Sequence, residues 1–317
     1  MRPRLVGIFG PTAAGKSELA VWLARRLGGE VVSVDSRQVY RRLDIGTAKP
    51  EPALRAAVPH HLLDVVDPDE PFDAARYAAL ARAAIAEIGK RGRAVVLCGG
   101  SGLYLRALAQ GLFGAAPPDQ RLRRRLDARL SERGSVAVHA ELAALDPEAA
   151  ARIAPRDAAR IRRALEVVLS TGRPLSVWQS EHGFRDEPYE ILSFVLSPPV
   201  EELARRIERR AAEMWRRGLA EETRALLAAG YDGRLRPLAA IGYREAQAYL
   251  RGELGREEAL TAIVRATRHY AKRQRTWFRG LEGAQWLSGE DEREEILVAC
   301  RAFLGPADGR DRASDNG

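Results

Sequence analysis

The sequence has few cysteines and no long apolar run, and these absences exclude whole classes of protein. Only 2 of its 317 residues are cysteine, and Cys98 and Cys300 lie far apart in the chain. Two distant thiols make neither a disulfide scaffold nor a zinc site, and they fit a reduced setting. No stretch approaches the ~20 apolar residues that a membrane-spanning helix needs. The N-terminus is basic and then briefly apolar, but it leads into a glycine-rich motif rather than a cleavage site. We therefore expect a soluble, cytoplasmic protein.

Positive charge is what the chain has in excess. Lys and Arg number 51 against 43 Asp and Glu, which gives a net charge of +8 and a pI of about 9.8. This balance favours an anionic partner such as a nucleic acid or a phosphorylated substrate. A GC-rich genome that prefers arginine codons would explain the charge equally well. Hydrophobic residues make up 46% of the chain, enough to give one large domain or two modest ones a real core.

Short apolar runs alternate with helical patterns in the first hundred residues. The runs predict strands at 5–10, 30–35 and 94–100, and the helical patterns lie at 16–27 and 73–92. Residues 50–72 are rich in proline and are expected to form a loop. This alternation predicts an α/β fold, with a parallel sheet like that of P-loop NTPases flanked by helices.

The character of the chain changes after residue 116. Residues 117–187 show helical patterns dense in arginine, and an apolar run near residue 190 then predicts another strand. We expect residues 1–116 and 188–304 to form the two parts of one core. Residues 117–187 are then an all-helical insertion, and the polar tail 305–317 is expected to be disordered.

The segment GPTAAGKS matches G-x-x-x-x-G-K-[ST], the phosphate-binding loop. It consists of Gly10, Pro11, Thr12, Ala13, Ala14, Gly15, Lys16 and Ser17. Glycines let the backbone wrap around a polyphosphate with its N–H groups toward the oxygens. Lys16 adds a point charge, and the Ser17 hydroxyl suits Mg²⁺. The motif identifies a class of ligand and not a reaction.

Asp35 is unusual for a protein with such a loop. ATPases, GTPases and kinases place a metal-binding aspartate after a later apolar strand, but the strand predicted at 94–100 has no acid at its end. Asp35 follows the second strand instead, which counts against ordinary NTP hydrolysis. We expect it to act as a general base, although a turn-forming role would explain its place as well. Ser101, in the segment GGSG, is expected to meet a ligand at a strand end unless this segment is a simple tight turn.

Arginine gathers in three helical segments, at 121–130, 156–166 and 266–280. The last also contains His269, Tyr270, Trp277 and Phe278. Such a mixture suits phosphate contacts combined with base stacking, at ~1–3 kcal/mol for each stacked base. An amphipathic helix with a solvated basic face would look similar. Three such segments in one chain favour a nucleic-acid partner.

Seven motifs occur in order over nearly the whole chain, from Gly7 to about Leu287. They are GPTAAGKS, VVSVDSRQVYRRLDIGTAKP, PHHLLDVVDP, GGSGLYLRAL, RIRRALEV, AIGYREA and RHYAKRQRTWFRG. Together they closely resemble the bacterial tRNA dimethylallyltransferases, also called tRNA isopentenyltransferases. The resemblance implies transfer of a dimethylallyl group from dimethylallyl diphosphate to N6 of adenosine 37, beside the tRNA anticodon. It also implies Mg²⁺ as the cofactor, no need for ATP, and an insertion that contacts the anticodon stem.

The resemblance further implies roles for individual residues. Asp35, Ser101 and Arg210 would be catalytic, with Asp35 as the base and Arg210 near the diphosphate. Ser101 falls where the family more often has threonine. Residues 10–17 would hold the diphosphate, and Ser17 would bind the metal. The implied tRNA contacts are Asp35, Ser36, Arg37, Gln38, Ser101, Arg123, Ala159, Arg160, Ile161, Arg162, Arg163, Ile241, Gly242, Tyr243 and Arg244.

Three other functions remain open from the residues alone. A small-molecule kinase with a helical lid would produce ADP but has no use for the basic C-terminal helix. An RNA-binding protein without activity would tolerate Asp35→Ala. An enzyme that prenylates free AMP, ADP or ATP would not need the insertion and the basic helix to contact an RNA stem. We expect a monomer.

Overall fold

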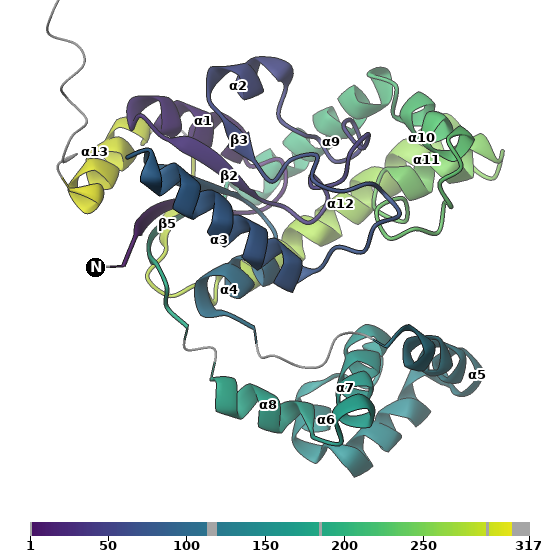
Figure 1. Ribbon diagram of the computed structural model, residues 1–317. Coiled ribbons are helices and arrows are strands. Elements are labelled where there is room, and N and C mark those ends of the chain that lie inside the picture. The colour runs from purple at the N-terminus through teal and green to yellow at the C-terminus, as the bar shows by residue number, and fades with distance from the viewer. Residues whose placement is uncertain (1, 113–118, 184–185, 290–291, 306–317) are drawn as a thin grey trace, which may run out of the picture. The chain divides into compact units, whose positions relative to one another are not determined.

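The computed structural model describes residues 2–112, 119–183, 186–289 and 292–305 (Figure 1). In this part of the chain a parallel sheet runs in the order β3-β2-β4-β1-β5-β6. Its strands are β1 (Arg4–Phe9), β2 (Glu30–Val34), β3 (His60–His61), β4 (Val95–Gly99), β5 (Glu190–Leu196) and β6 (Gln285–Leu287). Helices flank the sheet, so the predicted α/β fold is confirmed.

β1 lies between β4 and β5, and its side chains after the first are all buried. A strand buried on both faces needs a continuous apolar run, which is why β1 was recognisable in the sequence. Val6 and Ile8 belong to the core formed with α1 (Lys16–Arg26) and α13 (Arg293–Leu304). Phe9 stacks instead on Phe278 of α12 (Arg256–Phe278), with ring centroids 5.9 Å apart. The two faces of the sheet are thus covered by different helices.

α3 (Ala74–Lys90) and α4 (Gly102–Gln110) join α12 in packing against the sheet. The Tyr77 ring of α3 stacks on Tyr104 of α4 at 4.4 Å, and the Tyr77 hydroxyl donates to the Ser33 carbonyl at 3.1 Å. α3 begins after Asp73, whose side chain accepts from the Arg76 N–H at 2.9 Å. This N-cap satisfies one of the free N–H groups of the first turn.

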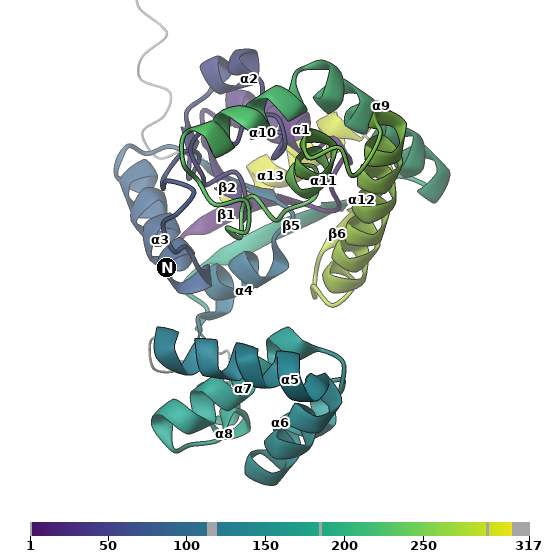
Figure 2. The ribbon, with the colours of Figure 1, turned by 90° about the vertical axis from the view of Figure 1, so that its right-hand side faces the viewer.

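α9 (Val200–Arg216) runs beside α12 in both views (Figures 1 and 2). α10 (Leu219–Ala228) and α11 (Tyr243–Leu250) pack on each other and hold the segment of residues 44–46. The Glu222 carboxylate accepts from all three backbone N–H groups of that segment, at 2.8–3.1 Å, and from the Tyr243 hydroxyl at 2.6 Å. The DIGTAKP and AIGYREA motifs therefore meet at one half-buried carboxylate.

The chain divides into two compact units, Met1–Ala109 with Pro188–Gly317, and Gln110–Glu187. The second unit contains α5 (Gln120–Leu145), α6 (Pro147–Arg152), α7 (Ala158–Thr171) and α8 (Leu175–His182). It has a core of its own, which includes Leu142, Ile161 and Leu165. Its helices have aspartate N-caps at Asp119, Asp146 and Asp157. The described part of this unit is helical throughout, as the absence of strand patterns predicted.

Residues 50–72 differ from the predicted loop. They contain α2 (Pro52–Ala57), with proline at its first position, and the two-residue strand β3, which pairs with Val31 and Val32. Both elements are too short for periodicity to reveal. The predicted boundary near residues 116–117 and the tail beyond Gly305 lie outside the described residues. Among the helices that are described, none is long and apolar enough to cross a membrane.

Candidate active site

Residues 10–17 connect β1 to α1 at the carboxyl edge of the sheet. Gly10 has φ 134°, and a Cβ there would lie 2.3 Å from the Leu196 carbonyl oxygen, so a side chain is excluded. Gly15 forms the N-cap of α1 with φ 94°, a left-handed conformation that suits glycine. The first turn of α1 directs its free N–H groups to the loop, as anion binding requires.

The Lys16 side chain is half-buried, and its ammonium donates to the Pro11 carbonyl at 2.6 Å. Burial lowers the pKa of Lys16 to about 8, and the positive charge of Arg210 acts in the same direction. A buried cation beside another cation gains most from an anion placed between them. The loop is therefore arranged for a polyphosphate.

Two arginines of α9 reach the same loop. Arg210 Nη1 donates to the Thr12 hydroxyl at 3.4 Å, and Arg206 Nη1 donates to the Ala14 carbonyl at 3.3 Å. Arg206 is also paired with Glu202 at 2.8 Å, whereas Arg210 has no ion-pair partner within the described ranges. Burial lowers the pKa of Arg210. Arg210 is thus the guanidinium that remains available for an added anion.

Asp35 follows β2 and forms a turn with the residues behind it. Its Oδ1 accepts from the Arg37 N–H at 2.8 Å and from the Gln38 N–H at 3.3 Å. Its Oδ2 accepts no hydrogen bond from any residue that the structure describes. Asp35 can therefore form the turn and also act as a general base, because Oδ1 accepts the hydrogen bonds of the turn and Oδ2 remains available to a substrate.

Ser101 follows β4, the strand next to β2. Its hydroxyl accepts from the Ser36 N–H at 3.0 Å, and its own N–H donates to the Val34 carbonyl at 3.1 Å. Burial raises the pKa of the neighbouring Tyr270 to about 12, and the Asp35 charge adds to this shift. The loops after β1, β2 and β4 thus meet at adjacent strand ends, where open α/β sheets bind ligands.

The sequence pattern did not identify Gln274 of α12 as a member of this site. Its amide contacts both Thr12 and Gly100, each at 2.9 Å. Buried positions on this part of α12 fall at Ala271, Gln274 and Phe278. An amide at a core position of an amphipathic helix was the available signal, because buried amides require hydrogen-bond partners.

The other predicted tRNA contacts of this unit differ in exposure. Arg37 Nη1 donates to the Arg236 carbonyl at 2.7 Å, and Gln38 Nε2 donates to the Ala48 carbonyl at 3.2 Å. Arg244 is exposed, whereas the Tyr243 side chain is buried in the core. Tyr243 therefore supports the surface around Gly242 from beneath, and its ring is not available to RNA.

The helical unit contains the remaining predicted contacts. Arg123 and Arg163 both donate to the buried Glu166 carboxylate, at 3.1 and 3.2 Å. Arg162 pairs with Asp127 at 2.7 Å. Ile161 is buried in the core of the unit, while Ala159 and Arg160 are exposed. The RIRRALEV motif thus combines core positions with guanidinium groups, and Ile161 belongs to the core.

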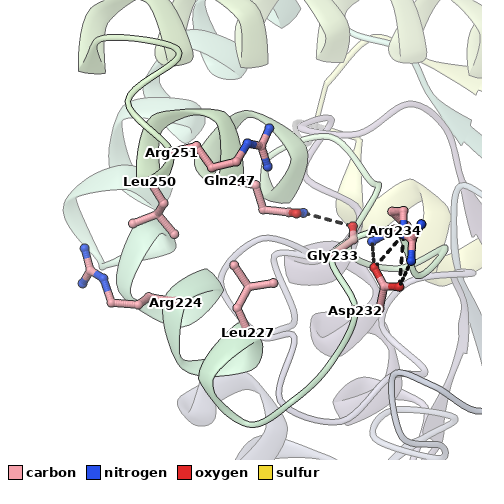
Figure 3. A pocket seen from close by; sticks show the side chains of 8 residues that line it. All are labelled: Arg224, Leu227, Asp232, Gly233, Arg234, Gln247, Leu250 and Arg251. Atoms are coloured by element: carbon pink, nitrogen blue, oxygen red, sulfur yellow. Dashed lines mark hydrogen bonds and ion pairs between the residues drawn. The ribbon is translucent and has the colours of Figure 1, made fainter.

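A cavity of about 550 Å³ lies between α10, α11 and the segment that joins them (Figure 3). Leu227 and Leu250 form apolar parts of its wall, and Gln247 donates to the Gly233 carbonyl at 3.3 Å at its edge. Its lining contains no residue of the phosphate loop and neither Asp35 nor Ser101. The candidate site is therefore defined by converging strand ends and not by this cavity.

Comparisons with known proteins point to one family. The model of the IPP transferase family matches residues 38–281. The tRNA dimethylallyltransferase of Geobacter metallireducens is 49% identical over 302 residues, which is 95% of this chain and 98% of that protein. The one of Anaeromyxobacter dehalogenans is 52% identical over 285 residues, or 90% of this chain and 95% of its own.

Solved structures agree. The tRNA isopentenylpyrophosphate transferase of Bacillus halodurans has a TM-score of 0.71 at 38% identity, covering 96% of this chain and 97% of its own. A eukaryotic dimethylallyltransferase described as acting on tRNA has a TM-score of 0.78 at 27% identity, covering 95% of this chain and 78% of its own. The family model and these relatives show that this chain belongs to the IPP transferase family.

Proposed function

We propose that this protein transfers the dimethylallyl group of dimethylallyl diphosphate to N6 of adenosine 37 in tRNA and releases diphosphate. The observation that carries the proposal is the meeting of a cationic phosphate loop with Asp35 and Ser101 at adjacent strand ends. The absence of an acid after β4, together with family membership, supports a prenyl diphosphate rather than ATP as the ligand of the loop.

The phosphate loop serves the leaving group. C1 of the donor is allylic, so the C1–O bond can break with cation character at C1 while its electron pair stays on the diphosphate. Lys16, Arg210 and the N–H groups of the first turn of α1 stabilise the charge that develops there. These groups are fixed before the reaction, so little reorganisation is needed when the bond breaks.

Asp35 serves the acceptor. The lone pair of adenine N6 is delocalised into the ring, so N6 attacks well only as it loses a proton. The N6–C1 bond forms while one N6 proton passes to Oδ2 of Asp35, the oxygen that the turn leaves without a partner. The Ser101 hydroxyl holds the Ser36 N–H and thereby fixes the position of this turn.

A Mg²⁺ ion fits the loop by the chemistry of its donors. The Ser17 hydroxyl makes no hydrogen bond with a described residue and is therefore available as a metal ligand. Mg²⁺ usually takes one or two protein oxygens together with phosphate oxygens and waters. The described residues contain no group of three His, Cys, Asp or Glu that would hold a metal without substrate. When bound, Mg²⁺ would neutralise charge on the diphosphate.

The tRNA must present a base that normally stacks in the anticodon loop. Extraction of such a base costs a few kcal/mol, which contacts to the RNA must offset. We assign Ser36, Arg37, Gln38 and Arg244 to the anticodon loop. Arg123 and the arginines of residues 160–163, on the helical unit, are assigned to phosphates of the anticodon stem. Because tRNA is the acceptor, we place the reaction in the cytoplasm.

A transfer assay tests the proposal. The protein is mixed with unmodified tRNA, labelled dimethylallyl diphosphate and Mg²⁺, without ATP, and a parallel reaction contains AMP in place of tRNA. We expect label in the tRNA and little in AMP. Label in AMP alone would contradict tRNA as the acceptor, and no label in either would contradict prenyl transfer.

A further inference from the structure

Gln274 is a polar side chain in the core. It lies on α12 with only 6% of its surface exposed. The Thr12 N–H donates to its Oε1 at 2.9 Å, and its Nε2 donates to the Gly100 carbonyl at 2.9 Å. A single buried amide therefore joins the phosphate loop after β1 to the loop after β4.

Glutamine matches the groups that the two loops present. One loop offers an N–H, from Thr12, and the other a carbonyl, from Gly100. A buried backbone group without a hydrogen-bond partner destabilises the folded chain. A primary amide both accepts and donates, so it satisfies both groups at once. Methionine or leucine would fill the same volume but satisfy neither, and an ionised glutamate could not donate to the carbonyl.

The Gln274 amide is packed closely against the backbone at Gly100. A Cβ built on Gly100 would lie 2.2 Å from Gln274 Nε2 and 3.1 Å from the Gly10 carbonyl oxygen. The phosphate loop, the β4–α4 loop and α12 thus meet at one point without space for a methyl group. A displacement of α12 here would move both loops.

Each end of the bridge leads to one substrate of the proposed reaction. Thr12 belongs to the diphosphate site, and its hydroxyl accepts from Arg210. Gly100 precedes Ser101, whose hydroxyl fixes the Ser36 N–H beside Asp35. The bridge therefore connects the donor side of the site with the acceptor side.

We propose that Gln274 is a positioning residue that sets the spacing between the diphosphate site and the site of the acceptor base. It thereby couples the binding of the prenyl donor to the binding of tRNA. The identity of the two substrates rests on the function proposed above. Bond formation needs reacting atoms about 3–3.5 Å apart, and a misplacement of about 1 Å can cost roughly 10²-fold in rate. A fixed bridge between the two loops provides this accuracy.

The test uses Gln274→Met, which keeps the volume and removes both hydrogen bonds. Three quantities are measured: the single-turnover rate of prenyl transfer with both substrates saturating, the Kd of inorganic pyrophosphate alone, and the same Kd with unmodified tRNA present. We expect the rate to fall about 10- to 100-fold. The Kd of pyrophosphate alone should change little, while the effect of tRNA on that Kd, present in the wild type, should disappear.

Leu297→Ala is the matched control for lost stability. Leu297 is a buried residue of α13 and contacts neither loop through a hydrogen bond, so its truncation lowers stability through a cavity alone. Its thermal unfolding is compared with that of Gln274→Met. In Leu297→Ala, the rate of prenyl transfer and the effect of tRNA on the Kd of pyrophosphate should both stay near their wild-type values.

Gly100→Ala changes the other partner in the same contact. It replaces Gln274→Met in the test if that variant does not fold. Its methyl group displaces the amide, so it should reproduce the loss of rate and of coupling. In the double variant the two effects should not add, because both remove one interaction.

Two results would overturn the inference. If pyrophosphate alone binds more weakly by the same factor as the rate falls, Gln274 holds only the phosphate loop. If neither the rate nor the coupling changes, the bridge has no functional role. A wild type that does not prenylate tRNA contradicts the proposed function instead. The effect of tRNA on pyrophosphate binding still tests the coupling in that case, and its absence in the wild type would refute it.

Discussion

The Asp35 carboxylate divides its two oxygens between structure and substrate. Oδ1 accepts two backbone N–H groups, while Oδ2 has no partner among the described residues. Asp35→Asn separates the two roles, since an amide oxygen can still accept at Oδ1 but an amide cannot take a proton from N6. We expect single-turnover transfer to fall about 10²- to 10⁴-fold.

Asp35→Ala, which also removes the turn, is the companion variant. Its tRNA binding should weaken in addition, because Arg37 and Gln38 lose the hydrogen bonds that hold their backbone. Near-normal transfer by Asp35→Asn would show that another group takes the proton.

The lowered pKa of Lys16 predicts how diphosphate binding depends on pH. Burial lowers its pKa to about 8, so the ammonium is present below that pH and is lost above it. Burial raises the pKa of the neighbouring Cys98 thiol to about 12, so this thiol stays neutral over the same range. Only the charged lysine attracts an anion, and pyrophosphate affinity should therefore fall as pH rises through about 8. Calorimetric titration between pH 6.5 and 9.5 measures this.

Pyrophosphate itself also changes its ionisation with pH. Lys16→Met is the control that measures this contribution without the titration of Lys16. Its pyrophosphate affinity should be lower than that of the wild type at neutral pH and should lose the extra decline near pH 8. The same decline in both proteins would mean that Lys16 does not titrate in this range.

The sequence predicted which strand ends carry several candidate site residues, but it could not reveal how these residues contact one another. Asp35 and Ser101 were recognisable because each follows an apolar strand, and parallel strands end at a common edge. The turn-forming role of Asp35 was an alternative and is in fact present, and the other carboxylate oxygen accepts no hydrogen bond from a described residue. Gln274 was missed, since its partners are backbone groups of loops distant in the sequence.

Glu166 organises the arginines of the helical unit. It is buried and accepts from Arg123 and Arg163, two of the predicted tRNA contacts. Glu166→Gln removes a negative charge, which by charge alone should tighten RNA binding. If the carboxylate positions the two guanidiniums, binding should weaken several-fold instead. Filter binding or fluorescence anisotropy with an anticodon stem-loop measures the sign of the change.

Glu141→Gln makes the same charge change in the same unit. Glu141 pairs with Arg129 and Arg133, which are not among the predicted tRNA contacts. This variant should bind the stem-loop as well as the wild type or slightly better. Tighter binding by Glu166→Gln, equal to that of Glu141→Gln, would rule out a positioning role.

The DIGTAKP motif has a structural explanation in the Glu222 carboxylate. Three successive backbone N–H groups, from Asp44 to Gly46, point to that carboxylate. Glu222→Gln keeps the shape but removes the charge, and we expect the free energy of unfolding to fall by about 1–3 kcal/mol. Urea denaturation measures it, with the exposed Glu221→Gln as a control that should change stability by at most about 0.5 kcal/mol. Equal stability of the two variants would contradict this role.

Long elements were predictable and short ones were not. β1, β2, β4, α1 and α3 carry strong apolar patterns, and each lies within a few residues of its expected position. α2 and β3 were not predicted, because elements of six and two residues are too short to show periodicity. β3 also depends on its pairing with β2. Such elements are specified by tertiary contacts rather than by their own sequence.

The excess of positive charge predicts how the protein as a whole meets RNA. The net charge is +8, and arginines are frequent in α5, α7, α9 and α12. Contacts with phosphates release counterions, so affinity for tRNA should fall roughly tenfold or more between 50 and 200 mM salt. Transfer to AMP, if any, should lack this steep dependence. Binding of tRNA that hardly changes over the same range would contradict phosphate contacts as the main source of affinity.

The central claim is that the dimethylallyl group goes to one atom of one nucleotide. Unmodified tRNA is incubated with the protein, dimethylallyl diphosphate and Mg²⁺, and its nuclease fragments are then analysed by mass spectrometry. A matched tRNA carries guanosine in place of adenosine 37. We expect a dimethylallyl mass increase on adenosine 37 alone, located to N6 by fragmentation, and none on the guanosine variant. An increase at another nucleotide, or none at all, would contradict it.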